Sequence, residues 1–215
     1  MLWRMSDPTT APLSGRRAQA ARNDQRILEA ARAVFGADPG APIAAVAEHA
    51  GVGISALYRR YRSKDELLQR LAGDGLRRYT AEAEAALADG GDPWTAFTRF
   101  MRRSLDAGTG SLSLRFAGTF TATEELHREG RSAHDATRRL LERTRAAGAL
   151  RPGVEVGDLS LLFEQLQSVR VGDQRRTSQL RHRYLALLLD GLHLTAAPLP
   201  GPAPRWREIS GRFGD

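Results

Sequence analysis

The sequence of 215 residues contains no cysteine and no run of eighteen apolar residues. The first absence excludes thiol catalysis and metal sites built from cysteine. The second predicts no transmembrane helix, because a helix needs about 20 apolar residues to cross a bilayer. The N-terminal segment MLWRMSDPTTAPLSGRR also lacks the continuous apolar core of a secretory signal. We therefore expect a cytoplasmic protein without a membrane partner.

Common motifs of enzymes are missing too. The sequence has no Ser-His-Asp order, no glycine-rich phosphate loop and no lysine-centred motif. The acid-x-x-His spacing of helical di-iron carboxylate bundles does occur, in Glu124–His127 and Asp190–His193. That chemistry needs two further inward-facing acids as metal ligands, and Glu142 or Glu164 would have to supply them. Because this spacing also arises by accident in charged helical proteins, we expect no metal, no cofactor and no enzymatic activity.

Patterns of β-strands are absent as well, since no segment shows sustained alternation of apolar and polar residues. Hydrophobic residues make up 41% and charged residues 27%, which is ordinary globular composition. The chain is therefore expected to be all-α. Apolar residues at helical spacing, with Gly and Pro at the breaks, predict helices over 17–36, 42–49, 54–61, 63–87, 93–107, 111–120, 122–147, 155–172 and 175–195. Residues 206–213 are expected to form a final turn or to fold back on the body.

The positive charge is concentrated at the N-terminal end of the chain. Residues 1–64 hold ten Arg or Lys against five Asp or Glu, whereas residues 65–215 hold twenty-two against twenty. A coding bias toward arginine would explain the choice of Arg over Lys, but not this asymmetry. The basic excess indicates that the N-terminal end docks on a polyanion.

Two short helices joined by a tight glycine turn predict a helix-turn-helix near residues 42–61. The small side chain of Ala47 lets the two helices approach closely. Gly51 can take the left-handed backbone conformation that the turn needs. In the second of these helices, Leu57 and Tyr61 are expected to face the core.

The other side of that helix predicts a DNA-reading surface. Its outward residues are expected to be Ser55, Ala56, Arg59 and Arg60, with Tyr58 at the edge. In a major groove, arginine can bond the O6 and N7 atoms of guanine, and a tyrosine hydroxyl can reach a phosphate. The alternative is that these side chains form only a solvated face.

Lys64 adds to this surface. It lies in the first turn of the next helix, where the helix dipole favours an anion over a cation. A lysine there makes sense beside a phosphate. Ser63 and Glu66 are expected to form a capping box at the start of the same helix.

The block from Ile27 to Leu68 closely resembles the DNA-binding domain of TetR-type transcriptional repressors. The resemblance lies in Ile27, Leu28, Ala30, Ala31 and Phe35, followed by V-A-E-H-A-G-V (46–52), L-Y-R-R-Y (57–61) and S-K-D-E-L-L (63–68). It implies a sequence-specific regulator, most simply a ligand-responsive repressor, that binds a near-palindromic operator in double-stranded DNA as a homodimer.

The resemblance also implies roles for single residues. Ser55, Ala56, Tyr58, Arg59 and Arg60 match the recognition helix, and Lys64 matches a phosphate-contacting lysine.

Four residues depart from the family pattern. Ala41 and Pro42 stand where the family commonly has threonine, so a phosphate contact there must come from backbone N–H groups. Ala56 replaces a frequent threonine, and Tyr61 replaces the more usual phenylalanine. These changes put the operator sequence in doubt. Arg16 and Arg17 are further candidates, for arm contacts to phosphate or the minor groove.

The helices expected at 155–172 and 175–195 are apolar on more than one face, which indicates a second partner. A homodimer interface of four helices would provide it, and a dimer could span two half-sites. The alternative is that both are central core helices of a monomer.

The resemblance also implies a small ligand between the helices of the larger half, and the large apolar side chains there would suit an apolar one. The candidate ligand-binding residues are Trp94, Phe97, Phe100, Met101, Phe116, Phe120, His127 and Gln167. The alternative is that these residues are ordinary core and that the protein binds DNA constitutively.

Four regions are therefore expected. They are a flexible arm (1–15), a helix-turn-helix domain (16–70), a helical ligand-binding and dimerisation domain (71–195) and a C-terminal tail (196–215).

Overall fold

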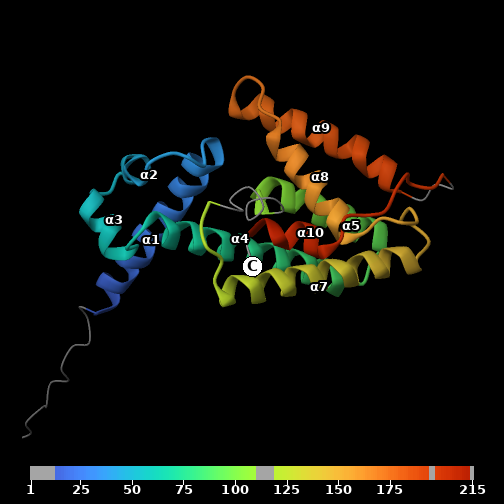
Figure 1. The fold of residues 1–215 in the computed structure, drawn as a ribbon, viewed down its shortest axis with the longest axis horizontal. Helices are drawn as coiled ribbons and strands as arrows, with labels where there is room; N and C mark the ends of the chain where they lie inside the picture. Colours follow the sequence, from blue (N-terminus) through green and yellow to red (C-terminus); the bar gives the residue numbers. More distant parts are fainter. Residues whose placement is uncertain (1–12, 110–118, 194–196, 214–215) are drawn as a thin grey trace, which may run out of the picture. The chain divides into compact units, whose positions relative to one another are not determined.

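The computed structural model describes residues 13–109, 119–193 and 197–213 (Figure 1). These residues are helical and contain no strand; an isolated bridge joins Leu150 and His193. The all-α prediction is confirmed. No helix in the described ranges is both long and apolar enough to cross a membrane. The chain divides into two compact units, residues 1–67 and 68–215, which we call the first and the second unit.

The first unit contains α1 (Leu13–Ala37), α2 (Ile43–Ala50) and α3 (Ile54–Arg60). Helix α1 begins four residues before the predicted start, while α2 and α3 agree with the prediction to within one residue. The core forms because each helix presents one apolar face, as the spacing of those residues predicts. Its most buried members are Ala31, Phe35, Val46 and Leu57, all at 0% exposure.

The turn between α2 and α3 depends on Gly51. Its φ of 62° lies in the left-handed region, and its N–H donates to the Glu48 carbonyl at 3.0 Å. The N–H of Val52 donates to the Ala47 carbonyl, also at 3.0 Å. Together these bonds close the C-terminus of α2 and turn the chain at once into α3. Ala47 itself is 3% exposed.

Helix α4 (Lys64–Ala88) begins in the first unit and continues in the second. The other helices of the second unit are α5 (Pro93–Ala107), α7 (Glu124–Ala146), α8 (Val156–Ser168), α9 (Gln174–Leu192), α10 (Trp206–Ser210) and η1 (Gly211–Phe213). Most of the helix predicted at 111–120 lies outside the described residues, and its last two positions form a turn and a bend.

Helix α8 ends four residues before the predicted boundary at 172, for a tertiary reason. Val169 takes an extended conformation, and side chains of α9 bind the backbone that follows. The Thr177 hydroxyl accepts from the Val171 N–H at 3.1 Å, and Arg181 donates to the carbonyls of Gln167 at 3.0 Å and Val169 at 3.2 Å. These bonds give partners to backbone groups that a continued helix would otherwise have satisfied by its own hydrogen bonds.

The core of the second unit lies among α4, α5, α7, α8 and α9. Phe97, Phe100, Met101 and Phe163 are at most 1% exposed. The ring of Tyr79 meets those of Phe100 and Phe163 edge to face, with centroids 5.1 and 6.1 Å apart. Such rings fill the space between helices more completely than aliphatic side chains alone.

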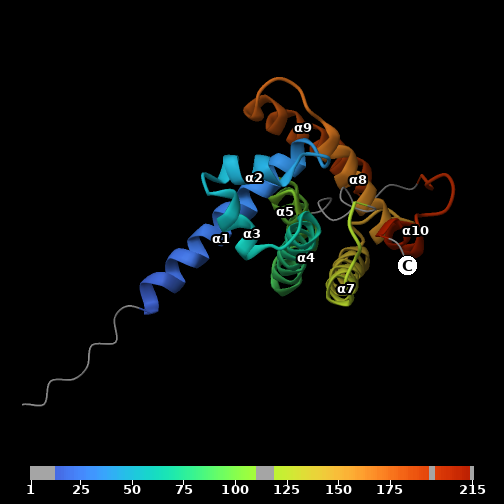
Figure 2. The same ribbon diagram turned by 60° about the vertical axis from the view of Figure 1, so that its left-hand side comes forward.

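The C-terminal residues both form a final helical turn and fold back on the body. Figures 1 and 2 show α10 beside α8, and the two helices are in contact. Ile209 of α10 is 5% exposed. Pro204 lies so close to Gly157 of α8 that a Cβ atom there would collide with the Pro204 carbonyl. A glycine at position 157 therefore permits this close approach.

Candidate functional sites

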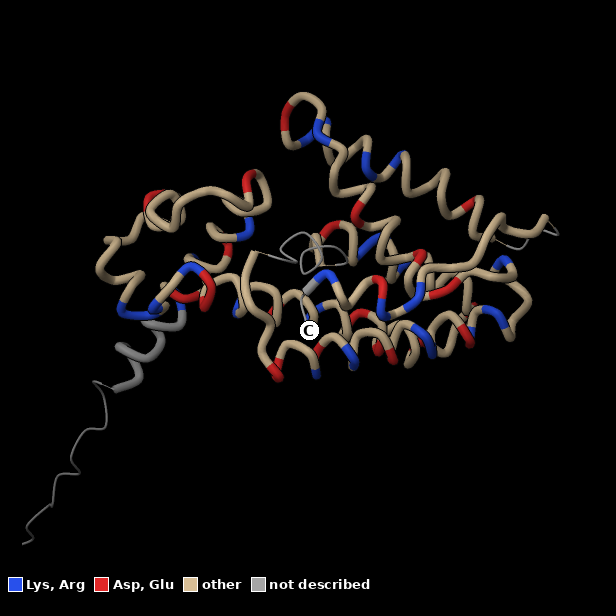
Figure 3. The backbone as a smooth tube through the Cα atoms, viewed as in Figure 1, with Lys and Arg blue, Asp and Glu red and all other residues tan. Residues whose placement is uncertain are grey.

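The exposed face of α3 is the first candidate site. Ser55, Arg59 and Arg60 are exposed and Tyr58 is 47% exposed, as predicted, whereas Ala56 is only half-exposed. On the opposite side Leu57 is 0% and Tyr61 3% exposed, so the predicted core side is confirmed. Figure 3 shows the positions of Arg and Lys gathered at the C-terminal end of this helix.

Two features of this face were not predicted from the sequence. Ile54, at the start of α3, is 40% exposed and offers an apolar contact beside Ser55. Asp24 of α1 binds the end of α3, because Arg60 donates from Nε at 2.8 Å and from Nη2 at 3.0 Å to its carboxylate. The Tyr61 hydroxyl donates to the same carboxylate at 2.6 Å. No local pattern links Asp24 to Arg60 and Tyr61, which lie 36 and 37 positions away.

This Asp24 pair distinguishes the two arginines of α3. Hydrogen bonds and the opposite charge of Asp24 raise the pKa of Arg60, which leaves the guanidinium fully ionised. The Arg60 side chain is 58% exposed and Asp24 only 15%, so a phosphate can still reach one side of Arg60. In the described part of the chain, Arg59 makes no ion pair and is exposed. Arg59 therefore has the freer approach to a polyanion.

Lys64 has partners that the sequence did not predict. Its Nζ donates to the Pro39 carbonyl at 2.9 Å and to the Ala41 carbonyl at 2.8 Å. It also lies 5.1 Å from the centre of the Phe35 ring. Lys64 thus ties the connection between α1 and α2 to the start of α4. Two of its three N–H donors are used in this way, which leaves one for an anion.

The remaining predicted residues of this surface are Arg16 and Arg17. Both lie in α1 and not in an arm that precedes the helix. Their side chains are outside the described part of the structure, so their contact with DNA stays a prediction.

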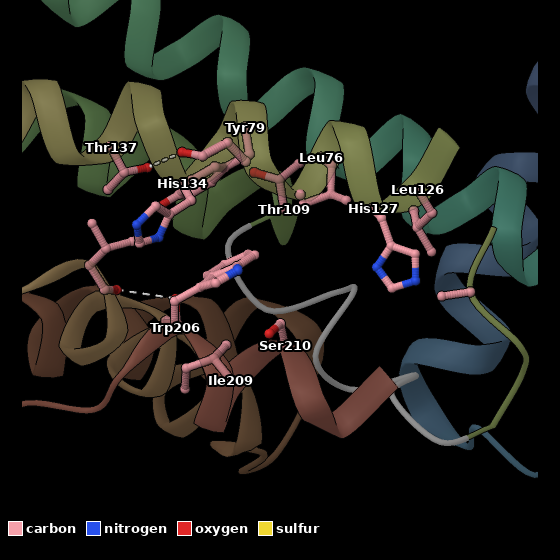
Figure 4. Close-up of a pocket in the computed structure, with 15 residues that line it drawn as sticks. Leu76, Tyr79, Thr109, Leu126, His127, His134, Thr137, Trp206, Ile209 and Ser210 are labelled. Atoms are coloured by element: carbon pink, nitrogen blue, oxygen red, sulfur yellow. Dashed lines mark hydrogen bonds between the residues drawn. The ribbon is translucent and has the colours of Figure 1, made fainter. Parts of the chain in front are cut away.

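A cavity in the second unit is the second candidate site. It has about 730 Å³ of empty space, including its opening, and is lined by α4, α7, α8 and α10 together with short connecting segments. The lining is largely apolar: Leu76 comes from α4, Leu126 from α7, Val156 from α8 and Ile209 from α10. Figure 4 shows the rings of His134 and Trp206 side by side at one end of this space.

Some polar groups of the cavity are already satisfied. The Tyr79 hydroxyl is hydrogen-bonded to Thr137 (Figure 4), whose own hydroxyl donates to the Ala133 carbonyl at 2.7 Å. Tyr79 is therefore the donor of the pair. Burial raises the pKa of Tyr79 to about 12, so its phenol stays protonated at neutral pH.

His134 is different. Its Nδ1 is buried and has no hydrogen-bond partner in the described residues. Burial also lowers the pKa of His134, which favours the neutral ring. A neutral imidazole carries one N–H donor and one acceptor nitrogen. An unpaired buried nitrogen costs free energy until a ligand or water satisfies it.

Most residues predicted for ligand binding lie elsewhere. Of those described, His127 lines this cavity. Phe97, Phe100 and Met101 are core residues. Trp94 packs beside them, and its ring centre lies 4.4 Å from that of His193.

The other predicted residues are placed as follows. Phe120 is 7% exposed, and Gln167 donates to the Leu105 carbonyl at 2.9 Å, so both have structural contacts. Phe116 lies outside the described residues. His134, Trp206 and Ile209 were not predicted from the sequence. Trp206 and Ile209 follow a proline-rich stretch that gave no reason to place them at a cavity.

The acid-x-x-His pairs do not form a metal centre within the described ranges, where no three His, Asp or Glu side chains gather closely enough to hold an ion. His127 belongs to the cavity wall and His193 to the packing against Trp94.

An exposed apolar strip on α9 is the third candidate site. Tyr184 is 45% and Leu187 60% exposed, although Leu185 and Leu189 on the other side are at most 4% exposed. The sequence predicted this breadth of apolar positions. Exposed large apolar side chains that share a helix face are typical of protein contacts.

Comparison with known proteins gives one consistent result. Residues 27–71 match the family described as bacterial regulatory proteins of the tetR family, and residues 92–194 match the C-terminal domain of SbtR-like transcriptional regulators. No curated protein matches the chain.

Solved structures agree with this. A TetR transcription regulatory protein from Mycobacterium vanbaalenii is 30% identical, with a TM-score of 0.55, over 82% of this chain and 98% of that one. The regulator SCO0520 from Streptomyces coelicolor is 24% identical, with a TM-score of 0.57, over 80% and 99%. LfrR from Mycobacterium smegmatis, in complex with proflavine, is 23% identical, with a TM-score of 0.56, over 77% and 95%.

Proposed function

Because the chain belongs to the TetR family of bacterial transcriptional regulators, which are DNA-binding proteins and not enzymes, we propose that it is a ligand-responsive repressor. It binds a near-palindromic operator as a homodimer and acts in the cytoplasm, where bacterial DNA lies. The observation that carries the proposal is the exposed face of α3, with Tyr58 and Arg59 opposite the buried Leu57.

DNA recognition would rest on unequal contributions along α3. Arg59 has no ion pair in the described residues and can bond guanine in the major groove. Tyr58 can donate to a phosphate. Ser55 and Ala56 lie at the start of the helix, where the half-exposed Ala56 offers only a methyl group. Arg60 and the third donor of Lys64 would contact phosphate while keeping their internal partners.

The dimer would form through α8 and α9. Tyr184 and Leu187 lie on the exposed side of α9, and Leu161 and Leu162 of α8 are half-buried. Burying Leu187 and its neighbours between two copies removes apolar surface from water, at roughly 25 cal/mol for each Å². Two copies would present two α3 helices to successive major grooves.

Ligand response is supported by the cavity and by its helices. Leu76 and Tyr79 of the cavity belong to α4, the helix that begins at Lys64 in the first unit. Among the similar structures, LfrR is in complex with proflavine, and two others are gamma-butyrolactone receptors. A ligand that binds one conformation of α4 better than another would shift DNA affinity.

Selection of bound fragments from random DNA tests the proposal. We expect two inverted half-sites about 34–36 Å apart, one helical turn. Affinity should fall steeply with salt, since phosphate contacts release counterions. Recovery of a single, non-repeated site would contradict the dimer, and recovery of no preferred sequence would contradict the operator.

The selected DNA then serves to test the ligand response. Small apolar compounds are screened for release of the labelled complex. If no compound changes DNA affinity, the protein is a constitutive DNA binder.

A further inference from the structure

The C-terminal segment, residues 204–212, supplies one wall of the cavity. Trp206, Ile209 and Ser210 line it, although all three follow the proline-rich stretch after α9. In Figure 4 this wall lies opposite the side chains carried by α4 and α7. One wall of the cavity therefore comes from the C-terminal segment and not from the longer helices of the unit.

The segment is held in place at several points. Arg212 donates from both terminal nitrogens to the Glu164 carboxylate of α8, each at 2.8 Å. Ile209 is buried, and Pro204 lies directly on Gly157. The Glu208 side chain accepts from the Arg205 N–H at 2.6 Å and so caps the short helix. A bidentate ion pair, a buried side chain and a close backbone approach together fix the position of Trp206.

Trp206 meets His134 inside the cavity. The two ring centres are 4.6 Å apart, with an angle of 52° between the planes. The far end of the indole also lies 3.8 Å from the position that a Cβ atom of Gly130 would take. Trp206 nevertheless remains 37% exposed, so part of its ring surface is uncovered. Next to it, His134 carries the buried and unpartnered Nδ1.

The charge of the lining indicates what could bind beside these rings. None of the described lining residues is Asp, Glu, Lys or Arg. An ion placed there would lose its hydration without gaining a counter-charge, which is costly in a site of low dielectric constant. A neutral aromatic molecule would lose little hydration and would gain contact with Trp206. One N–H or O–H group on it could donate to the acceptor nitrogen of the neutral His134 imidazole, which lines the cavity.

We propose that the C-terminal segment is part of the ligand site, and that Trp206 and His134 together select a neutral aromatic ligand with one hydrogen-bond donor. This inference rests on the proposed role of the cavity in ligand binding. Trp206 covers one face of the ligand, and His134 fixes its polar group. The Arg212–Glu164 pair lies outside the cavity and holds the wall closed over the ligand.

A pair of dyes tests this without knowledge of the natural ligand. N-phenyl-1-naphthylamine is neutral, aromatic and apolar, and carries one N–H donor. 8-Anilinonaphthalene-1-sulfonate has the same ring skeleton with an added sulfonate. Both fluoresce more strongly in apolar surroundings, so each can be titrated against the full-length protein without DNA. We expect the neutral dye to bind at least about tenfold more tightly than the anionic one.

Variants then assign the contacts. Trp206→Ala should lower the affinity for the neutral dye by about tenfold. Trp206→Phe should lower it by less, because a smaller ring remains. His134→Phe keeps the ring contact and removes the nitrogen, for an expected loss of roughly fivefold. Arg212→Gln should weaken binding by about threefold through the loosened wall. Arg207→Gln, an exposed residue of the same helix, is the matched control and should bind like the wild type.

Each result decides one part of the proposal. Equal affinity of wild type and Trp206→Ala for the neutral dye, with unchanged circular dichroism and melting temperature, would overturn the role of the segment. Equal or tighter binding of the anionic dye would overturn the preference for neutral ligands. No saturable binding of the neutral dye to the wild type would overturn the site itself. Failure of the ligand-responsive repressor proposal is distinguished by the separate DNA experiment, in which no compound would change the affinity of the protein for its operator.

Discussion

The α3 face and the cavity differ in how their polar groups are satisfied. On the α3 face, Arg60 and Tyr61 share Asp24, and Lys64 binds two carbonyl oxygens, so charged groups are held in place before any partner arrives. In the cavity, charged residues are missing from the described lining and the Nδ1 of His134 has no partner there. The first arrangement suits the polyanion proposed for it, since exposed charges cost little in water. The second suits a neutral molecule that leaves water.

The largest expected effect concerns Arg59. Arg59→Ala removes a side chain with no ion pair in the described residues, so the substitution should change DNA affinity and not stability. We expect operator affinity to drop by about tenfold or more, with the melting temperature unchanged. Tyr58→Ala should act similarly. Gel-shift titration measures this, and Arg102→Ala on α5 removes the same charge as a control. Operator affinity like that of the wild type in both α3 variants would break the assignment of this face.

Arg60→Ala should differ from Arg59→Ala in a way that sharpens the comparison. It also weakens DNA binding, but in addition it removes the ion pair between Arg60 and Asp24. Because Arg60 is 58% exposed, solvent screens the pair, and we expect a loss of at most about 1 kcal/mol in the free energy of unfolding. Chemical denaturation of the two alanine variants measures the difference. Identical stability would show that the Asp24 pair does not hold α3.

Leu187→Asp tests the dimer that brings two α3 faces to one operator. A buried carboxylate at the interface would shift the protein toward monomers, and operator affinity should fall with it. Sedimentation over a range of protein concentrations measures the shift. Ser178→Asp adds the same charge near the start of α9 and should leave the dimer intact. A variant at position 187 that stays dimeric would exclude this strip from the interface.

Tyr79→Phe tests whether the cavity tolerates the loss of a polar group that is already paired. Thr137 keeps the Ala133 carbonyl as a partner, so no hydroxyl is left unsatisfied. We expect the free energy of unfolding to fall by about 1 kcal/mol. Thermal and denaturant unfolding measure it. A loss of several kcal/mol would mean that the hydroxyl supports more of the structure than its one bond indicates.

The smallest expected effect concerns pH. Asp135, Arg138 and Glu155 are the charged groups that act on His134, but burial dominates and lowers its pKa below 6.5. The folded protein therefore favours the neutral ring, and binding of the neutral dye should be constant at neutral pH. As the pH falls through the lowered pKa of His134, affinity should fall, because the protonated imidazole no longer accepts a hydrogen bond. His134→Phe should lose this dependence. An affinity that does not change with pH in the wild type would contradict the bond to His134.

The residues 27–68 alone were enough to predict the helix-turn-helix and the family. Its parts are local: apolar residues at helical spacing, the Gly51 turn and the basic residues of α3 all lie within a few turns of one another. Local spacing reports backbone conformation directly, because each helical bond joins residues four apart. The all-α fold and most helix boundaries followed in the same way.

The tertiary structure decided which of these residues carry internal contacts and where the cavity lies. Asp24 meets Arg60, Lys64 meets Pro39, and Trp206 meets His134 only because distant segments pack together. The sequence placed the large side chains of Phe97, Phe100 and Met101 on a predicted helix and made them candidates for ligand binding, with ordinary core as the alternative, but it could not decide between the two. That choice depends on the volumes contributed by all the surrounding helices, including a C-terminal segment whose position no local pattern determines.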